Sequence, residues 1–199
     1  MNKFSTLVFG ALYMIVLSTL LLVVAPYVQL KSVPPTPGLK PYTEQQERGR
    51  YIYMREGCIY CHSQQPRDAK QAPDAKRGWG RASVPSDYYH DNPHLLGTMR
   101  TGPDLFNIGA RQPSADWQLS HLYDPRAVTP GSIMPPYPYL FRISANPQPG
   151  AKIVTLPPEF APQNGSVIAA EDALDLVAYL LSLDRTFPAI PVPAPQAQK

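Results

Sequence analysis

Residues 58–62 read Cys-Ile-Tyr-Cys-His and contain both cysteines of the 199-residue chain. The pattern Cys-x-x-Cys-His is typical of the covalent attachment of a c-type haem. Two thiols three residues apart can reach two vinyl groups on one edge of a porphyrin, while the adjacent imidazole lies beneath the iron. The motif therefore predicts that Cys58 and Cys61 tether a haem c and that His62 is its proximal ligand.

Other uses of a cysteine pair fit this sequence less well. A structural zinc site normally needs four protein ligands in two close pairs, and the sequence has no second such pair. A thioredoxin-like dithiol expects a βαβ pattern around it, which the sequence lacks. A plain disulfide is compatible with an oxidising compartment but leaves His62 unexplained.

The N-terminal segment is long and apolar, with no charged residue from Phe4 to Leu30. As a helix it would span ~40 Å at ~1.5 Å per residue, enough to cross a bilayer with some tilt. The apolar core of a cleaved signal peptide is typically only ~7–15 residues long. The length therefore favours an uncleaved anchor over residues 1–30, held in the lipid bilayer.

The charges that flank this anchor do not orient it, because Lys3 lies on one side while Lys31 and Lys40 lie on the other. The haem motif is more informative, since c-type cytochromes acquire their haem outside the bacterial cytoplasmic membrane. We therefore expect a single-pass protein of the bacterial inner membrane, with everything after Leu30 on the periplasmic side.

Proline is abundant, with 25 residues in 199, and it is clustered. Four prolines between residues 31 and 42 predict an extended linker between membrane and domain. A second group lies between Pro135 and Pro162, and a third predicts a mobile or surface-wrapping tail over residues 188–199. Residues 43–187 remain as one domain, large enough for a modest core around a haem.

Three helices are predicted in this domain, over residues 44–56, 115–122 and 169–183. Thr43 and Gln46 form a capping-box pattern at the first, which leads into Cys58. Ser114 can cap the second, which must end before Pro125. No strong strand alternation competes with these helices, so we expect an all-α domain with long Pro-rich loops.

The order of these helices resembles the class I cytochrome c fold, in which the last helix packs across the one that precedes the haem motif. In such folds a small residue on the first helix allows an aromatic side chain of the last to approach. Gly49 and Tyr179, together with Tyr53, are the candidates for this contact. The alternative is that Gly49 only loosens its helix, which costs ~1 kcal/mol.

The iron also needs a sixth ligand, or an open site if the protein itself binds oxygen or peroxide. The candidates in the domain are Met54, Met99, Met134, His90, His94 and His121. Met54 precedes Cys58 by four residues on the same predicted helix, so we expect it to stay on the proximal side. Met134 is favoured, because it precedes two prolines whose restricted φ angles hold a loop extended. Met99 is the main rival, although a lone methionine more often fills a gap in a core. His90 and His94 flank a proline in an expected surface loop, and His121 is expected to pack at the end of the middle helix.

Three longer stretches make the resemblance more specific. They are REGCIYCHSQ, HLLGTMRTGPDLFNIGAR and DWQLSHLYDPRAVTPGSIMPPYPYL. From about Tyr42 to Phe141 they resemble the mono-haem subunit II of cbb3-type haem-copper cytochrome c oxidases, and the anchor and total length agree.

This resemblance implies roles for individual residues. Cys58 and Cys61 would form the thioether bonds of one haem c, and His62 and Met134 would be the axial ligands of its iron. By analogy with class I cytochromes, the Pro103 carbonyl would accept a hydrogen bond from His62, which fixes the ring and raises its basicity.

Basic residues stand out at two further places. Arg111 is placed to meet a haem propionate, with an ordinary surface arginine as the alternative. Residues 67–81 carry three more basic than acidic side chains and depart from the family pattern. This loop is either a docking surface for an acidic partner or a solvated run of charges.

Closed coordination by His62 and Met134 would leave the iron no vacancy for a substrate. We therefore expect the domain only to accept and pass single electrons. Thioether ligation raises the reduction potential of the haem, which suits a donor to a terminal oxidase. The resemblance implies transfer from another c-type cytochrome subunit or donor to the haem-copper catalytic subunit in aerobic respiration.

Two other functions remain compatible with the sequence. One is the cytochrome c subunit of a nitric oxide reductase, which also couples one anchor to one haem c. The other is a free-standing membrane-anchored electron carrier, for which the linker would act as a long tether. The net charge of +3 does not indicate nucleic acid, since basic and aromatic residues are not interleaved.

Overall fold

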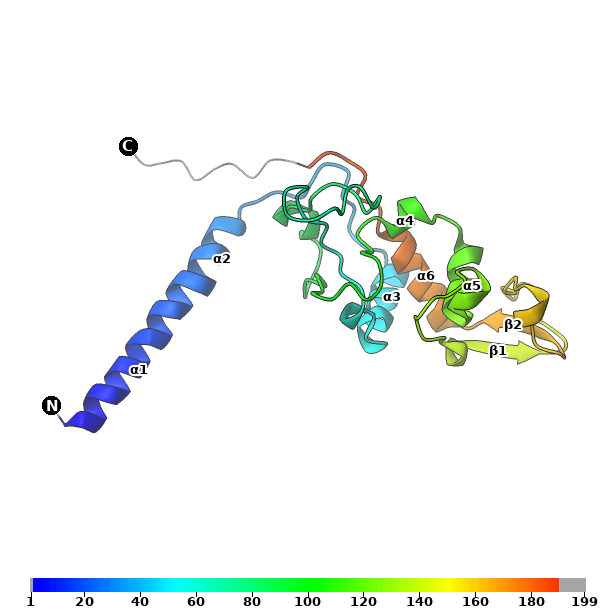
Figure 1. Ribbon diagram of the computed structural model, residues 1–199, viewed down its shortest axis with the longest axis horizontal. Coiled ribbons are helices and arrows are strands. Elements are labelled where there is room, and N and C mark those ends of the chain that lie inside the picture. Colours follow the sequence, from blue (N-terminus) through cyan, green and yellow to red (C-terminus); the bar gives the residue numbers. More distant parts are fainter. Residues whose placement is uncertain (1, 190–199) are drawn as a thin grey trace.

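The computed structural model describes residues 2–189, which form a long N-terminal helix and a folded domain joined by a short segment (Figure 1). The helix runs from Lys3 to Leu30. It comprises α1 (Lys3–Thr19), a π-helical stretch (Leu20–Val24) and α2 (Ala25–Leu30). Pro26 lacks an amide hydrogen and so leaves one carbonyl of the preceding turn without its usual partner. The wider π-helical turn just before Pro26 lets the helix continue past this missing hydrogen bond.

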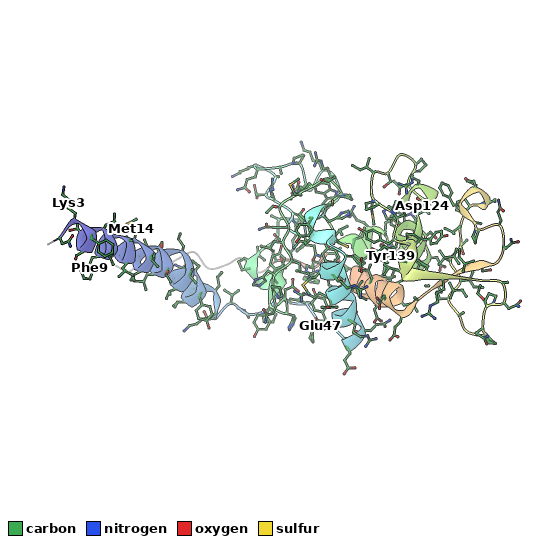
Figure 2. All side chains as sticks on the ribbon, turned by 90° about the horizontal axis from the view of Figure 1, so that it is seen from below. Lys3, Phe9, Met14, Glu47, Asp124 and Tyr139 are labelled. Atoms are coloured by element: carbon green, nitrogen blue, oxygen red, sulfur yellow. The ribbon has the colours of Figure 1, made fainter. Side chains whose placement is uncertain are left out.

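This helix has the length and composition of a membrane span. Its 28 residues include a window with a mean hydropathy of 2.6, and they extend ~42 Å at ~1.5 Å per residue. Phe9 and Met14 project from it and are 63% and 60% exposed (Figure 2). Apolar side chains exposed along a whole helix need lipid or a partner around them. The structure agrees with the predicted anchor.

The domain contains four α-helices, α3 (Glu44–Arg55), α4 (Ile108–Arg111), α5 (Ala115–Tyr123) and α6 (Glu171–Ser182). The three longer helices are the predicted ones. At the start of α3 the Thr43 hydroxyl accepts from the Gln46 amide at 3.3 Å, and the Gln46 side chain accepts from the Thr43 amide at 2.9 Å. Ser114 caps α5 by accepting from the Trp117 amide at 3.2 Å.

Helix α6 packs across α3, and this contact depends on Gly49. A Cβ atom at Gly49 would lie 1.9 Å from the Asp175 carbonyl oxygen and 2.8 Å from Tyr179 Cβ. The rings of Tyr53 and Tyr179 meet edge to face with centroids 5.5 Å apart, and both are fully buried. The predicted contact between Gly49, Tyr53 and Tyr179 is confirmed.

The expectation of an all-α domain is incomplete, because a small antiparallel sheet is present. Strand β1 (Phe141–Ser144) pairs with β2 (Ser166–Ala169), and Phe141 lies opposite Ala169. Each strand has only four residues, too few for a clear alternation of polar and apolar side chains. The strands are stabilised by pairing with each other across a long loop and by burial of Val167 and Ala169. Local strand propensity alone is not sufficient.

Many prolines open short 3₁₀ turns. These turns are Pro85–Tyr88, Pro125–Ala127, Pro138–Leu140 and Pro158–Phe160. The proline ring holds φ near the helical value. Amide hydrogens in the first turn of a helix have no partner within the helix, so the lack of one in proline costs no hydrogen bond there. The Pro-rich loops are therefore built from defined turns.

The segment between the anchor and α3 is packed on the domain, although its prolines predict an extended linker. Thr36 is buried, its amide donates to the Ser86 carbonyl at 3.2 Å, and its hydroxyl donates to Asp87 at 2.9 Å. Gly38 packs against the ring of Phe187, near the other end of the domain. The tail predicted over residues 188–199 lies, from residue 190 on, outside the described residues.

The basic loop over residues 67–81 is folded against the domain by charge pairs. Buried Asp74 accepts a hydrogen bond from Arg100 at 2.8 Å, and buried Asp87 receives two from Arg81, at 2.7 and 2.8 Å. Trp79 is buried beneath the Arg100 guanidinium. The basic side chains of the loop that remain exposed are Arg67, Lys70, Lys76 and Arg77.

Candidate haem site

The two cysteines lie on a tight turn that follows α3. The helix ends at Arg55, and Gly57 has a left-handed φ of 72°, after which Cys58–Tyr60 form a 3₁₀ turn. The His62 amide then donates to the Cys58 carbonyl at 2.9 Å. The first predicted helix is therefore confirmed as far as Arg55 but does not continue into Cys58, because the glycine interrupts it.

Cys58 and Cys61 are both free thiols and differ in exposure, since Cys61 lies at the surface while Cys58 is half-buried. Burial raises the pKa of the Cys58 thiol to about 12, and nearby Glu56 adds to the shift. The raised pKa disfavours the thiolate of Cys58, which is the reactive form of a thiol. Both thiols remain available for a bond to another group.

His62 is held in one orientation. Its Nδ1 lies 2.7 Å from the Pro103 carbonyl oxygen, and a carbonyl can only accept, so Nδ1 carries the proton. Burial lowers the pKa of His62, although the hydrogen bond to Pro103 acts in the opposite direction. The neutral ring leaves the lone pair of Nε2 available, the form in which histidine binds a metal. The hydrogen bond expected by analogy is present.

Gly102 lets this imidazole lie directly against the backbone. A Cβ atom at Gly102 would lie 2.3 Å from Cε1 and 2.7 Å from Nδ1 of His62. The Gly102 amide also donates to the Cys61 carbonyl at 2.9 Å. A larger residue at this position would displace the ring.

The buried carboxylate of Asp104 joins the residues after His62 to the Gly102–Pro103 segment. It accepts hydrogen bonds from Ser63 Oγ at 2.6 Å, from the Gln65 amide at 2.8 Å and from the Phe106 amide at 2.9 Å. Burial raises the pKa of Asp104, with these hydrogen bonds acting against the shift. Two segments 41 residues apart are thereby locked together around the imidazole.

Arg111 lies beside the same imidazole. Its Nη2 donates to the Asp104 carbonyl at 2.5 Å, and its Nε is buried with no hydrogen-bond partner among residues 2–189. Burial lowers the pKa of Arg111, and its charge in turn lowers the pKa of His62. A guanidinium whose buried Nε–H is unused is suited to an anionic group, such as a carboxylate.

His121, in the last turn of α5, is a second histidine near His62. Its ring stacks on Trp117 with centroids 4.6 Å apart, and its Nδ1 is buried without a hydrogen-bond partner in the described part of the chain. Burial, with a smaller contribution from nearby His62, lowers the pKa of His121 to about 4. The expected packing at the end of the helix is confirmed, but the closeness to His62 was not predicted.

The family model described as cytochrome c oxidase, mono-heme subunit/FixO, matches residues 1–156. The chain belongs to this family. A comparison with curated proteins found no match. The resemblance drawn from the sequence is thus confirmed at the level of the family, which is described as the mono-haem subunit of cytochrome c oxidase.

The residues of this FixO-family subunit fit a haem better than a metal ion bound by side chains alone. Within residues 2–189, no three His, Cys, Asp or Glu side chains converge as ligands of one metal ion. The thiols and His62 are therefore not arranged as a zinc site. Free thiols, an imidazole with its Nε2 available and the unused Nε of Arg111 are the groups that a porphyrin, its iron and a propionate require.

Met134 of the FixO-family subunit has the more ordered setting of the two methionine candidates. It is half-buried against the core, and its loop is held by Arg126, whose guanidinium donates to the Ser132 carbonyl at 3.4 Å and to the Met134 carbonyl at 3.3 Å. Met99 is 55% exposed. Met134 as a ligand stays a prediction, and the structure gives it a rigid loop.

The other two histidine candidates, His90 and His94, each pack against a nearby tyrosine. The ring of His94 meets Tyr88 edge on at 6.1 Å, and that of His90 meets Tyr89 at 5.2 Å. His94 also lines a cavity beside the last turn of α2. The surface setting expected from the neighbouring proline agrees with this position.

Tyrosines surround the cysteine turn, and sequence reasoning did not single them out. Burial raises the pKa of Tyr137 to about 12, and nearby Cys58 adds to the shift. Tyr139 donates a hydrogen bond to Glu56 at 2.5 Å, which ties the Pro-rich loop after Met134 to the end of α3. The partners are 83 residues apart, so no local pattern could have predicted the contact.

Proposed function

We propose that this subunit carries one haem c bound through Cys58 and Cys61 and relays single electrons to the haem-copper catalytic subunit of a cbb3-type oxidase. The setting of His62 is the observation that carries this proposal. The ring is half-buried and neutral. Its Nδ1 is bound to the Pro103 carbonyl, so Nε2 is left free to bind one other partner. A haem held there would supply one-electron transfer.

Met134 would be the second axial ligand, and Arg111 would pair with a propionate. Arg126 holds the backbone on both sides of Ile133, so Met134 keeps a fixed position. With His62 and Met134 both engaged, no position remains for a substrate, and oxygen reduction falls to another subunit. A propionate would give the buried Arg111 Nε the hydrogen-bond partner that it lacks among the described residues.

Apolar side chains next to the cysteine turn support the docking of an electron-transfer partner. Tyr60 is 76% exposed, Ile133 is 78% exposed and Tyr139 is 65% exposed. Tyr60 precedes Cys61, and Ile133 precedes Met134, so these side chains mark the surface closest to the proposed haem. Large apolar side chains that gather on a surface are typical of partner interfaces.

The packed linker favours a fixed subunit over a free-ranging carrier. Thr36 is bound to Ser86 and Asp87 of the domain, five residues after Lys31. At ~3.6 Å per extended residue, the domain lies within ~18 Å of the end of the anchor. Such a short connection suits electron transfer to a catalytic subunit in the same membrane. Haem attachment to Cys58 and Cys61 supports the periplasmic side for the domain.

The test is to purify the full-length protein from membranes in a mild detergent and to identify the subunits, haems and metals that accompany it. We expect a copper-containing oxidase that consumes oxygen. A solitary haem protein, or a complex with non-haem iron that consumes nitric oxide, would contradict the proposal.

The ligand is tested by Met134→Leu, with Met99→Leu as the matched control. Loss of the thioether should lower the midpoint potential by the order of 100 mV, a fraction of the ~0.8 V range that axial ligands span. Met99→Leu should leave both the reduced absorption spectrum and the potential unchanged. The same potential in Met134→Leu as in the wild type would exclude Met134.

A further inference from the structure

A second concave site lies where the anchor meets the domain, and the haem does not explain it. The cavity has a volume of about 510 Å³, which is within the range of ligand sites. One wall is the end of α2 with the residues that follow, including Tyr27, Leu30 and Lys31. The other wall comes from the domain, including Tyr88, Tyr89, His94 and Leu96.

The packed linker keeps the two walls of this cavity close to each other. Thr36 fixes the chain to the 3₁₀ turn Pro85–Tyr88, whose residues Pro85 and Tyr88 line the cavity. The turn therefore cannot move far from Lys31 without breaking the hydrogen bonds of Thr36 to Ser86 and Asp87. Tyr88 is itself held by its hydroxyl, which donates to the Gln64 carbonyl at 2.8 Å.

The position of the cavity points to a lipid. Tyr27 is 67% exposed and Leu30 is 43% exposed on the last turns of a helix long enough to cross a bilayer. The end of such a helix lies at the level of the lipid headgroups, where tyrosine side chains are enriched. The cavity is therefore open to the upper acyl chain and headgroup of a neighbouring phospholipid.

The charge around the cavity selects the kind of lipid. Lys31 is the basic side chain in the lining, and His94 adds a ring nitrogen. The nearby carboxylates are turned to other partners, since Asp87 is paired with Arg81 and Asp91 accepts from Tyr42 at 2.8 Å. A lysine next to the headgroup level attracts anionic lipid, and here no described carboxylate competes for it in the lining.

We propose that this cavity binds one anionic phospholipid, with its phosphate at Lys31 and its upper acyl chain along Tyr27 and Leu30. The lipid would fill the space between anchor and domain and fix the angle between them. This inference does not depend on the electron-relay function.

The experiment uses the full-length haem-loaded protein in mild detergent with equal amounts of phosphatidylglycerol and phosphatidylcholine of the same chain length. Native mass spectrometry counts the lipid that stays bound. We expect one retained phosphatidylglycerol per chain. Lys31→Gln should weaken its retention about fivefold, the change expected for one lysine near the membrane surface. Leu96→Trp should fill the cavity and abolish the retention of phosphatidylglycerol.

Matched controls are Lys40→Gln, at an exposed lysine beyond Thr36, and Ile143→Trp, at an exposed strand position. Both should retain lipid as the wild type does, and an unchanged haem spectrum shows that each variant is folded. Equal retention in Lys31→Gln, Leu96→Trp and the wild type would overturn the proposal. So would equal retention of the two lipids, or a photo-crosslinker at Leu96 that reacts with another polypeptide of the purified oxidase and not with lipid.

Discussion

Replacing Gly102 with alanine should displace the His62 imidazole and leave the domain folded. The added methyl group would lie 2.3 Å from Cε1 and 2.7 Å from Nδ1 of the ring. Carbon atoms in contact are normally ~3.5–4.0 Å apart, so the ring must move by more than ~1 Å. It can move, because it is the end of a side chain and not backbone. Bonds to a metal tolerate only about 0.2 Å, so Nε2 would leave its position for the iron.

The assay combines three measurements on the full-length protein in detergent. The absorption spectrum reports the spin state of the iron, a potentiometric titration gives the midpoint potential, and circular dichroism gives the unfolding temperature. Gly102→Ala should lose the low-spin spectrum and shift the potential, while the unfolding temperature changes by less than ~4 °C, equivalent to about 1 kcal/mol. Gly10→Ala, where the built Cβ has nothing within 4 Å, is the control and should change none of the three. A wild-type spectrum and potential in Gly102→Ala would refute the reasoning.

Two further predictions concern stability. Gly49→Ala places its methyl group 1.9 Å from a backbone oxygen of α6, which cannot rotate away. We expect a net loss of about 2 kcal/mol after the gain of ~1 kcal/mol in helix propensity, and hence an unfolding temperature lower by ~4–8 °C. Gln45→Ala on the exposed side of α3 should not change the unfolding temperature. An unchanged unfolding temperature in Gly49→Ala would count against the predicted clash. For Asp87, burial acts to raise the pKa, but the Arg81 ion pair and the Val84 and Thr36 hydrogen bonds lower it overall. The stabilisation is present above the unfolded pKa of ~3.9 and is lost as the pH falls through the lower folded value. Unfolding temperatures measured from pH 6 to pH 3 should therefore fall less in Asp87→Asn than in the wild type; parallel curves would show that Asp87 contributes nothing.

Local patterns in the sequence were sufficient for several parts of this protein. The apolar run to Leu30 predicted the anchor, since a span requires only length and hydropathy. Thr43 and Ser114 predicted helix starts, because capping joins residues three positions apart. The family resemblance predicted the hydrogen bond between His62 and Pro103, which is present, while haem attachment at the motif around Cys58 stays a prediction.

Other features depend on residues distant in sequence and have no local signal. Strands β1 and β2 are too short to show an alternation and exist because they pair with each other. The four prolines between residues 34 and 41 predicted an extended linker. Thr36 within it is nevertheless buried, because it hydrogen-bonds to residues about 50 positions away. Tyr139 reaches Glu56 across 83 residues. In each case, contacts between residues far apart in the sequence decide the structure.

The sequence by itself determined that the protein has an apolar anchor, three helices, two of them capped by Thr43 and Ser114, and a haem attachment motif, because these depend on spacing within a few residues. Only the tertiary structure decided how His62 is held, with Gly102 against its ring, Asp104 locking the segments around it and Arg111 beside it. It also decided that the domain lies close to the end of its anchor, because Thr36 is bound to Ser86 and Asp87. The physical reason is that ring orientation, burial and an unused N–H are set by contacts between segments that fold together from far apart in the chain.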